Sequence, residues 1–364
     1  MNCNETHKEE HHETHILTLD SAKEVEARYF FLFQVDREPG SGLLLQAMKA
    51  IAYKGYGNAD CMEEVELPDP VPGELEILVK IHATSVNPVD WKIRSGSLKL
   101  ITGNQFPRVP GVDFAGKVVD VGKHARRFRK GDSVFGMMPV FSTIVGTYAT
   151  LVAIPEKFAA AAPANLPLEQ CAAIPLAGLT ALQSLRDRGG MKDGFRVLIN
   201  GASGGVGCFA TQIAKIYRGE VTAVTSGKNA DFVRGLGADH IINYHNQDFT
   251  RIGEEFDLVL DCVSNSTFDA CKRILAPNGT YVTLLPTASV LFHSVMGSVF
   301  GGKRCAYTAV SIQSDDLDIL RQYAQGKTIE PRVDKLMPLN RAREAHELSE
   351  SGRVRGKMVL TVSD

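Results

Sequence analysis

The segment from Arg196 to Lys215, RVLINGASGGVGCFATQIAK, constrains the fold more than any other part of the chain. It opens with a short apolar run typical of a β-strand, and three glycines, Gly201, Gly204 and Gly207, follow at once. Apolar residues then recur at helical spacing, so the segment predicts a strand, a tight turn and a helix. A helix N-terminus behind a glycine turn presents free N–H groups and a partial positive charge, which suits a pyrophosphate.

The spacing of these glycines, GxxGxxG, differs from the commoner GxGxxG of dinucleotide-binding folds. A P-loop is excluded, because no Gly-Lys-Ser/Thr follows the turn. We predict a dinucleotide site here. The alternative is a glycine turn that serves only the close packing of the strand against the helix.

Composition narrows the class of protein. The chain has 364 residues, enough for two domains, and its net charge of −2 does not favour nucleic acid or an anionic membrane as the main partner. Seven cysteines are scattered without a CxxC, which favours a reducing compartment, and we expect a cytoplasmic protein. The longest apolar stretch, residues 288–302, is too short to span a bilayer, and we expect it to be buried or at an interface.

The chain divides into three regions. Residues 1–47 are polar and acidic, resemble neither a secretory signal nor a usual transit peptide, and are predicted to be a disordered extension. The alternative is a metal site formed by His7, His11 and His15 on one helix face. Residues 48–164 contain short strands between turns, which predicts a small barrel or sandwich, completed by residues 327–364, whose last strand, Lys357 to Thr361, is expected to pair back into it. In residues 165–326, strands alternate with helical patterns, which include residues 168–185 and 267–276, and this predicts an α/β fold with a parallel sheet.

The residues after the second strand of this sheet indicate which dinucleotide binds. An Asp or Glu there would bond the ribose 2′-hydroxyl of NAD, whereas hydroxyl and basic residues admit the 2′-phosphate of NADP. The predicted strand 221–225 is followed by Ser226, Gly227 and Lys228, without a carboxylate. We therefore predict NADPH, with Ser226 and Lys228 at its 2′-phosphate; the alternative for Lys228 is an ordinary solvated lysine. The folded regions show no metal-ligand spacing and no GxSxG elbow.

Six segments together carry a resemblance to a known family, and they cover nearly everything from Met48 onward. They are ATSVNPVDWKIRSG (83–96), FPRVPGVDFAGKVVDVG (106–122), KGDSVFG (130–136), AAIPLAGLTALQSL (172–185), NGASGGVG (200–207) and LGADHIINY (236–244). With them the chain resembles the zinc-independent quinone oxidoreductase branch of the medium-chain dehydrogenase/reductase superfamily, which includes plant enone oxidoreductases. The resemblance implies a GroES-like β-barrel domain and a doubly wound Rossmann dinucleotide-binding domain.

The resemblance also implies roles for individual residues. The pyrophosphate would contact Ser203, Gly204, Gly205 and Val206, and the 2′-phosphate would contact Ser226 and Lys228. The adenosine would lie near Tyr244, and Thr180 would face the pyrophosphate or the nicotinamide. Lys92 would lie at the nicotinamide end and stabilise an enolate oxygen; the alternative is a solvent-facing lysine. Asn87 would orient the acceptor carbonyl; the alternative is a turn residue before Pro88.

The same resemblance bears on the reaction. Zinc-dependent relatives have a Cys where this chain has Asn87, and a His-Glu pair where it has Val112 and Asp113. Without a Lewis acid, the reaction that remains is hydride transfer from NADPH to a quinone or to the C=C bond of an α,β-unsaturated carbonyl. The sequence offers no obvious general acid for that reaction.

Two other functions remain open at this point. One is a sensor or scaffold that binds NADPH with little turnover, on an organelle surface through residues 291–300. The other is an enoyl-thioester reductase, for which Arg94 and Arg108 are isolated candidates. The resemblance further implies a small-molecule substrate, a homodimer, and a chloroplast or other organelle as the alternative location. Peripheral membrane association belongs to the scaffold alternative.

Overall fold

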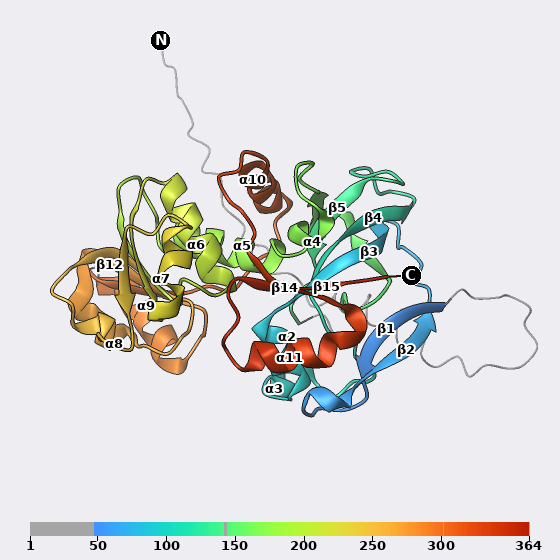
Figure 1. The fold of residues 1–364 in the computed structure, drawn as a ribbon, viewed down its shortest axis with the longest axis horizontal. Helices are drawn as coiled ribbons and strands as arrows, with labels where there is room; N and C mark the ends of the chain where they lie inside the picture. Colours follow the sequence, from blue (N-terminus) through green and yellow to red (C-terminus); the bar gives the residue numbers. More distant parts are fainter. Residues whose placement is uncertain (1–46, 142–143, 301, 364) are drawn as a thin grey trace, which may run out of the picture.

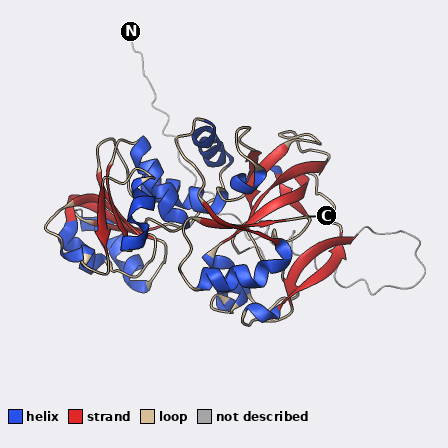
Figure 2. Ribbon diagram, viewed as in Figure 1, coloured by secondary structure: helices blue, strands red, loops and turns tan. Residues whose placement is uncertain are grey.

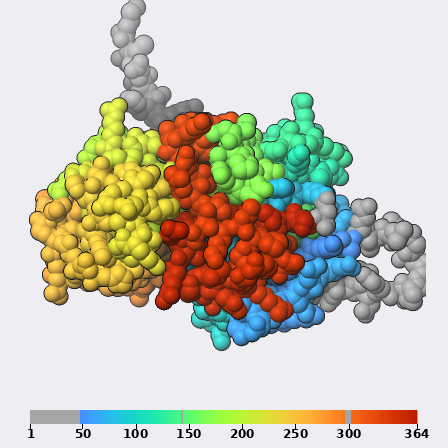
Figure 3. All heavy atoms as spheres, viewed as in Figure 1, coloured from blue at the N-terminus to red at the C-terminus, as the bar shows by residue number. Residues whose placement is uncertain are grey.

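The computed structural model describes residues 47–141, 144–300 and 302–363. Two lobes lie side by side in Figure 1, one formed by the yellow and orange middle of the chain and the other by the blue and green first part. Red C-terminal elements lie against the blue and green lobe, and in Figure 3 their atoms fill much of the surface between the two lobes.

The lobe formed by the middle of the chain is organised around a parallel sheet. Within the described residues it has six strands in the order β10-β9-β8-β11-β12-β13. Their bounds are β8 Arg196–Asn200, β9 Glu220–Thr225, β10 His240–Asn243, β11 Phe256–Asp261, β12 Leu275–Thr283 and β13 Arg304–Tyr307. The strand order reverses direction between β8 and β11, and in such sheets ligands bind beyond the carboxyl ends of the strands at that point. The predicted glycine turn begins at the carboxyl end of β8.

Helices cover both faces of this sheet (Figure 2). Successive strand residues point to opposite faces, so Val197 and Ile199 pack in one apolar cluster and Leu198 packs in another. The first cluster includes residues of α5 (Pro175–Gln183), α6 (Gly205–Ile216) and α10 (Ser314–Gln325). The second includes residues of α8 (Phe268–Cys271) and α9 (Ala288–Phe300). The short helix α7 (Ala230–Arg234) follows β9.

The lobe formed by the first part of the chain contains a mainly antiparallel sheet. In the described ranges its larger sheet has seven strands, β14-β15-β3-β4-β5-β7 with β6 paired to β3. Their bounds are β3 Glu76–Val86, β4 Asp113–Val121, β5 Ser133–Met137, β6 Leu151–Pro155, β7 Ala159–Ala161, β14 Val333–Pro338 and β15 Lys357–Thr361. A hairpin and four helices complete the lobe: β1 Ala47–Tyr53, β2 Met62–Pro68, α2 Pro88–Arg94, α3 Lys99–Thr102, α4 Leu168–Cys171 and α11 Ala342–Glu350.

The predicted fold class, a GroES-like barrel joined to a doubly wound dinucleotide-binding domain, is confirmed. The last strand also pairs back into the barrel lobe, as expected, because β15 is antiparallel to β3. The extension predicted at residues 1–47, with its alternative histidine metal site, lies outside the described residues except for Ala47.

Two helix predictions were wrong in their extent. The helix expected over residues 168–185 is broken, because Pro175 begins a new helix at the position where its missing N–H costs nothing. The helix expected over residues 267–276 ends at Cys271, and β12 begins at Leu275. Residues 288–302 were expected to be buried or at an interface; α9 exposes Leu291, Phe292 and Val295, so the interface stays a prediction. No helix in the described part of the chain is both long enough and apolar enough to cross a membrane.

Candidate active site

Two glycines of the turn after β8 are needed for close packing, and a third lies beside open surface. Gly201 has a φ of +79°, and a Cβ there would lie 2.6 Å from Val263 Cγ2. A Cβ on Gly207 would lie 2.2 Å from the carbonyl oxygen of Gly201, so these two glycines allow the strand and helix to approach closely. A Cβ on Gly204 would meet only one atom, at 3.4 Å. Close packing therefore accounts for Gly201 and Gly207, whereas the open surface at Gly204 leaves the pyrophosphate site as a prediction.

The carboxyl ends of β9 and β10 carry the groups predicted to bind the 2′-phosphate and the adenosine. Ser226 is 5% exposed, and its hydroxyl has no hydrogen-bond partner among the described residues. Lys228 is exposed and forms no ion pair with any described residue. Tyr244 is 54% exposed, and its backbone N–H donates to Thr225 O at 3.2 Å. A buried hydroxyl without a partner is unfavourable, so an acceptor oxygen on a ligand would satisfy Ser226.

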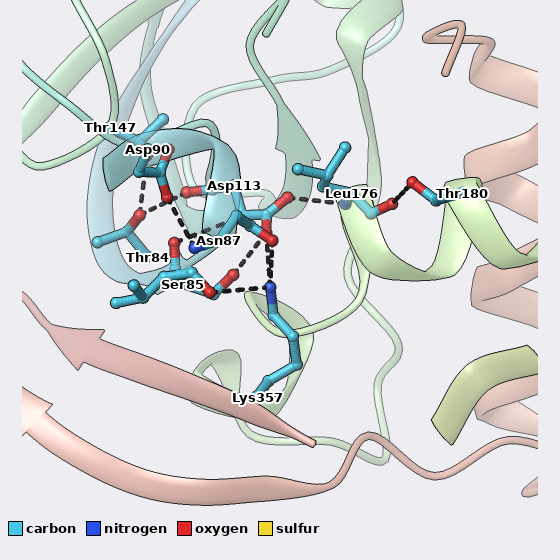
Figure 4. Close-up of polar contacts among 10 residues, drawn as sticks. Thr84, Ser85, Asn87, Asp90, Asp113, Thr147, Leu176, Thr180 and Lys357 are labelled. Carbon is cyan, nitrogen blue, oxygen red and sulfur yellow. Dashed lines mark hydrogen bonds and ion pairs between the residues drawn. The ribbon is translucent and has the colours of Figure 1, made fainter. Parts of the chain in front are cut away.

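A buried network lies where the C-terminal strand crosses the barrel (Figure 4). Met358 pairs with Val86, so the preceding residue, Lys357, falls beside Asn87 at the end of β3. The Lys357 ammonium donates to Asn87 Oδ1 at 2.5 Å, to Val86 O at 3.3 Å and to Asp113 Oδ2 at 3.4 Å. Burial lowers the pKa of Lys357, and the carboxylate of Asp113 opposes that shift.

Asp113 is the acceptor on which this network converges. Its Oδ2 accepts from Ser85 Oγ at 2.5 Å and from Asn87 Nδ2 at 2.8 Å, and its Oδ1 accepts from Leu176 N at 2.8 Å. The side-chain amide of Asn87 is thereby bonded at both ends. The structure therefore favours a positioning role for Asn87 over direct contact with an acceptor carbonyl.

Lys357 also connects this network to the glycine turn. The N–H of the preceding residue, Gly356, donates to Ser203 O at 2.9 Å. A Cβ on Gly205 would lie 3.0 Å from Lys357 Cδ, so the lysine side chain passes directly beside the turn. The barrel network and the predicted pyrophosphate site are thus in contact through one side chain.

A small pocket in the barrel lobe adjoins the network. It has a free volume of about 30 Å³, enough for a water molecule. Three polar side chains line it, those of Tyr53, Asp90 and Arg108. Its other side chains are mainly apolar, among them Ile93, Val112, Met138, Pro139, Val140 and Val145. Asp90 joins the pocket to the network, because its Oδ2 accepts the backbone N–H of Asn87 at 2.7 Å.

The other predicted residues lie around these features. Lys92, on α2, is half-buried, and its ammonium lies 5.6 Å from the centre of the Trp91 ring without an ion pair to any described residue. Thr180 is buried on α5, where its hydroxyl donates to Leu176 O at 2.6 Å, and Leu176 in turn bonds Asp113. Val206 is half-buried on the first turn of α6.

Comparison with known proteins supports this architecture. Residues 73–164 match the alcohol dehydrogenase GroES-like domain, and residues 236–360 match the zinc-binding dehydrogenase family. The chain is 31% identical to the chloroplast envelope quinone oxidoreductase homolog of Arabidopsis thaliana, over 86% of this chain and 98% of that protein. It is 32% identical to the 2-methylene-furan-3-one reductase of Solanum lycopersicum, over 86% and 79% of the two chains.

Solved structures agree. The quinone oxidoreductase from Coxiella burnetii superposes with a TM-score of 0.81 at 31% identity, covering 87% of this chain and all of that one. The chain belongs to the quinone oxidoreductase branch of the medium-chain dehydrogenase/reductases. As a member of this family it is an oxidoreductase that uses a nicotinamide dinucleotide and a small-molecule substrate.

The zinc-ligand positions of this quinone oxidoreductase homologue hold other side chains. The amide of Asn87 stands where zinc-dependent relatives have a Cys, and Val112 stands where they have a His. Among residues 47–141, 144–300 and 302–363, no group of three or more His, Cys, Asp or Glu is placed to hold a metal ion. The oxygens nearest these positions, on Asn87 and Asp113, already bind the Lys357 ammonium, so a cation would have to displace it.

Two site residues of this oxidoreductase were missed by sequence reasoning. Asp90 was noted only as part of the segment 83–96, and Lys357 only as the start of a strand. The signal for Lys357 is its place directly after Gly356, where a lysine opens the strand that returns to the barrel. No sequence signal reveals that Asp90 is 3% exposed, since burial depends on residues distant in the chain.

Proposed function

We propose that this protein is an NADPH-dependent, zinc-independent reductase that transfers hydride to quinones or to the C=C bond of α,β-unsaturated carbonyls. The observation that carries the proposal is the junction at Lys357, where the glycine turn meets a buried ammonium network and, through Asp90, an apolar pocket. The printed names of relatives support it, since they include quinone oxidoreductases and a 2-methylene-furan-3-one reductase.

The residues present fit a dinucleotide with a 2′-phosphate. The open side of Gly204, together with Ser203, Gly205 and Val206, would hold the pyrophosphate at the N-terminus of α6. The unpartnered hydroxyl of Ser226 and the exposed ammonium of Lys228 would hold the 2′-phosphate. Tyr244 would contact the adenosine, and Thr180 would lie toward the nicotinamide. When bound, NADPH supplies a hydride.

The chain's own residues would do the rest of the chemistry. The Lys357 ammonium provides a fixed positive charge inside the barrel, where zinc-dependent relatives carry a cation. The apolar side chains around the pocket would contact the hydrocarbon part of the acceptor, while the pocket itself has room for a water molecule. Lys92 would stabilise the developing negative charge on the acceptor oxygen, because its ammonium has no other hydrogen bond among the described residues.

The test is NADPH consumption, followed by nicotinamide absorbance, with a panel of enones, enals and quinones. We expect turnover with at least one acceptor class, and a higher kcat/KM with NADPH than with NADH. Equal binding of the two cofactors would contradict the 2′-phosphate assignment. NADPH binding without consumption on any acceptor would contradict the reductase and favour a sensor or scaffold.

Location and assembly are also proposed. We propose a cytoplasmic protein that forms a homodimer, with peripheral attachment to a membrane through the exposed apolar side chains of α9 as the alternative. Sedimentation of the purified chain, with and without vesicles, separates these states. A monomer that does not bind vesicles would contradict both the homodimer and the membrane attachment.

A further inference from the structure

Asp90 is a buried acidic group without a counter-charge. It is 3% exposed and makes no ion pair with any residue in the described ranges. Its carboxyl accepts backbone N–H bonds from Asn87, at 2.7 Å, and from Gly111. A carboxylate is costly in such surroundings, whereas a neutral acid is not. Burial accordingly raises the pKa of Asp90 to about 7, and the nearby Asp113 adds to the shift.

The charged groups around Asp90 are engaged elsewhere. The ammonium of Lys357 lowers the pKa of Asp90 by its charge but donates its hydrogen bonds to other acceptors. The guanidinium of Arg108 donates to the carbonyls of Gln105 and Thr102. The titratable and charged groups that face Asp90 across the pocket and the network are Tyr53, Arg108, Asp113, Tyr148, Lys357 and, beyond Tyr148, Arg94.

We propose that Asp90 is the general acid of this reductase, an inference that rests on the function proposed above. Hydride addition to the β-carbon of an enone forms one C–H bond and moves the π electrons onto the carbonyl oxygen, giving an enolate. The O–H bond of Asp90 then breaks, its proton passes to a water in the pocket, and a proton of that water forms the second C–H bond at the α-carbon. The carboxylate that remains is reprotonated from solvent, so dihydronicotinamide, acceptor and one proton yield nicotinamide and the saturated carbonyl.

The position of Asp90 suits this step. It lines the pocket, which has room for a water molecule that would connect its carboxyl group to an acceptor held by the surrounding apolar side chains. It also lies in the first turn of α2, three residues after Asn87, whose side chain is bonded to Lys357 beside the glycine turn. An acid with a pKa near the working pH is an effective proton donor that can be recharged in each cycle. A carboxyl that only capped α2 would gain nothing from being neutral, because the backbone N–H groups it accepts favour a carboxylate.

The experiment compares the full-length protein with Asp90→Asn on an α-methyl cyclic enone in D₂O. For the native protein we expect deuterium on one face of the α-carbon, and a kcat that falls as the pH rises above about 7. Asp90→Asn should lower kcat at least about 100-fold, or yield product with deuterium on both faces, because solvent then protonates the enolate. The Kd for NADPH should change by less than about twofold, since Asp90 does not contact the predicted cofactor residues. Asp120→Asn removes an exposed carboxyl of the same lobe and should match the native protein in every respect.

A second readout needs no cofactor. Because the folded pKa of Asp90 is raised, its own contribution to stability should fall as the pH rises from about 4 to about 7 and stay constant above about 8. Burial of His346 gives the native protein an opposite dependence below about pH 6.5, so the Asp90 contribution is measured as the difference between the native protein and Asp90→Asn. The urea midpoint of Asp90→Asn should exceed that of the native protein by an amount that grows over the same interval.

The outcomes separate the two proposals. If the native protein reduces enones and Asp90→Asn keeps both the single-face deuteration and the native pH profile, Asp90 is not the acid, while the reductase stands. If Asp90→Asn does not fold, a native kcat that is constant from about pH 5 to about pH 9 overturns the inference. If the native protein reduces no acceptor, the proposed function fails and this inference fails with it.

Discussion

Replacing Lys357 with Met tests whether the buried network stabilises the protein as a charge pair. The ammonium has three N–H donors, and three acceptors receive them: Val86 O, Asn87 Oδ1 and Asp113 Oδ2. Lys357 is 4% exposed and Asp113 is fully buried. Methionine fills a similar volume but leaves the carboxylate buried without its cation. Removing one partner of a buried pair costs about 3–5 kcal/mol.

The expected value lies at the lower end of that range. Three donors, from Ser85, Asn87 and Leu176, still reach Asp113 in the variant. We therefore expect Lys357→Met to lower the free energy of unfolding by about 3 kcal/mol at neutral pH, a large share of the stability of a typical domain.

A matched control is present in the same lobe. Lys130 and Asp120 form another Lys–Asp pair, with Nζ and Oδ1 only 2.8 Å apart, but their side chains are 64% and 47% exposed. Lys130→Met should cost no more than about 1 kcal/mol, because water screens the exposed pair. Urea unfolding followed by circular dichroism measures both variants. Equal losses in the two variants would refute the reasoning, since it requires burial, rather than distance, to set the cost.

Further predictions concern stability and cofactor choice. Burial lowers the pKa of His346 to about 3, so the unfolded chain binds a proton that the folded protein does not. The contribution of His346 to stability should therefore fall as the pH drops from about 6.5, by roughly 3 kcal/mol near pH 4.5, and urea titrations should show it as the difference between the native protein and His346→Gln. Lys228→Ala should raise the Kd for NADPH about tenfold and leave that for NADH unchanged, whereas the exposed Lys192→Ala should alter neither. Gly207→Ala should destabilise the fold by about 3 kcal/mol, because its Cβ would meet a backbone carbonyl at 2.2 Å; Gly253→Ala, with nothing within 4 Å, should not.

The sequence predicted the parts of the fold that depend on local patterns. Alternating strands and helices indicated the parallel sheet, and the glycine turn after Asn200 indicated where a dinucleotide would bind. In a parallel sheet, the residues that follow each strand lie at the same edge. Ser226 follows β9 and Tyr244 follows β10, which are consecutive in the chain and paired in the sheet, so the two residues come together. The edge strand β13, the strand β14 and the helix α11 were missed, because short segments with mixed composition carry little periodicity.

By itself, the sequence determined the class of fold, the dinucleotide turn and the lack of a carboxylate after the second strand of the sheet. Only the tertiary structure decided the chemistry of the barrel lobe. Lys357 and Asn87 are 270 positions apart and meet because β15 pairs with β3 in one register. The protonation of Asp90 was likewise undecided by the sequence, because a carboxyl group keeps its ordinary pKa until the folded chain removes water from it and leaves it without a cation.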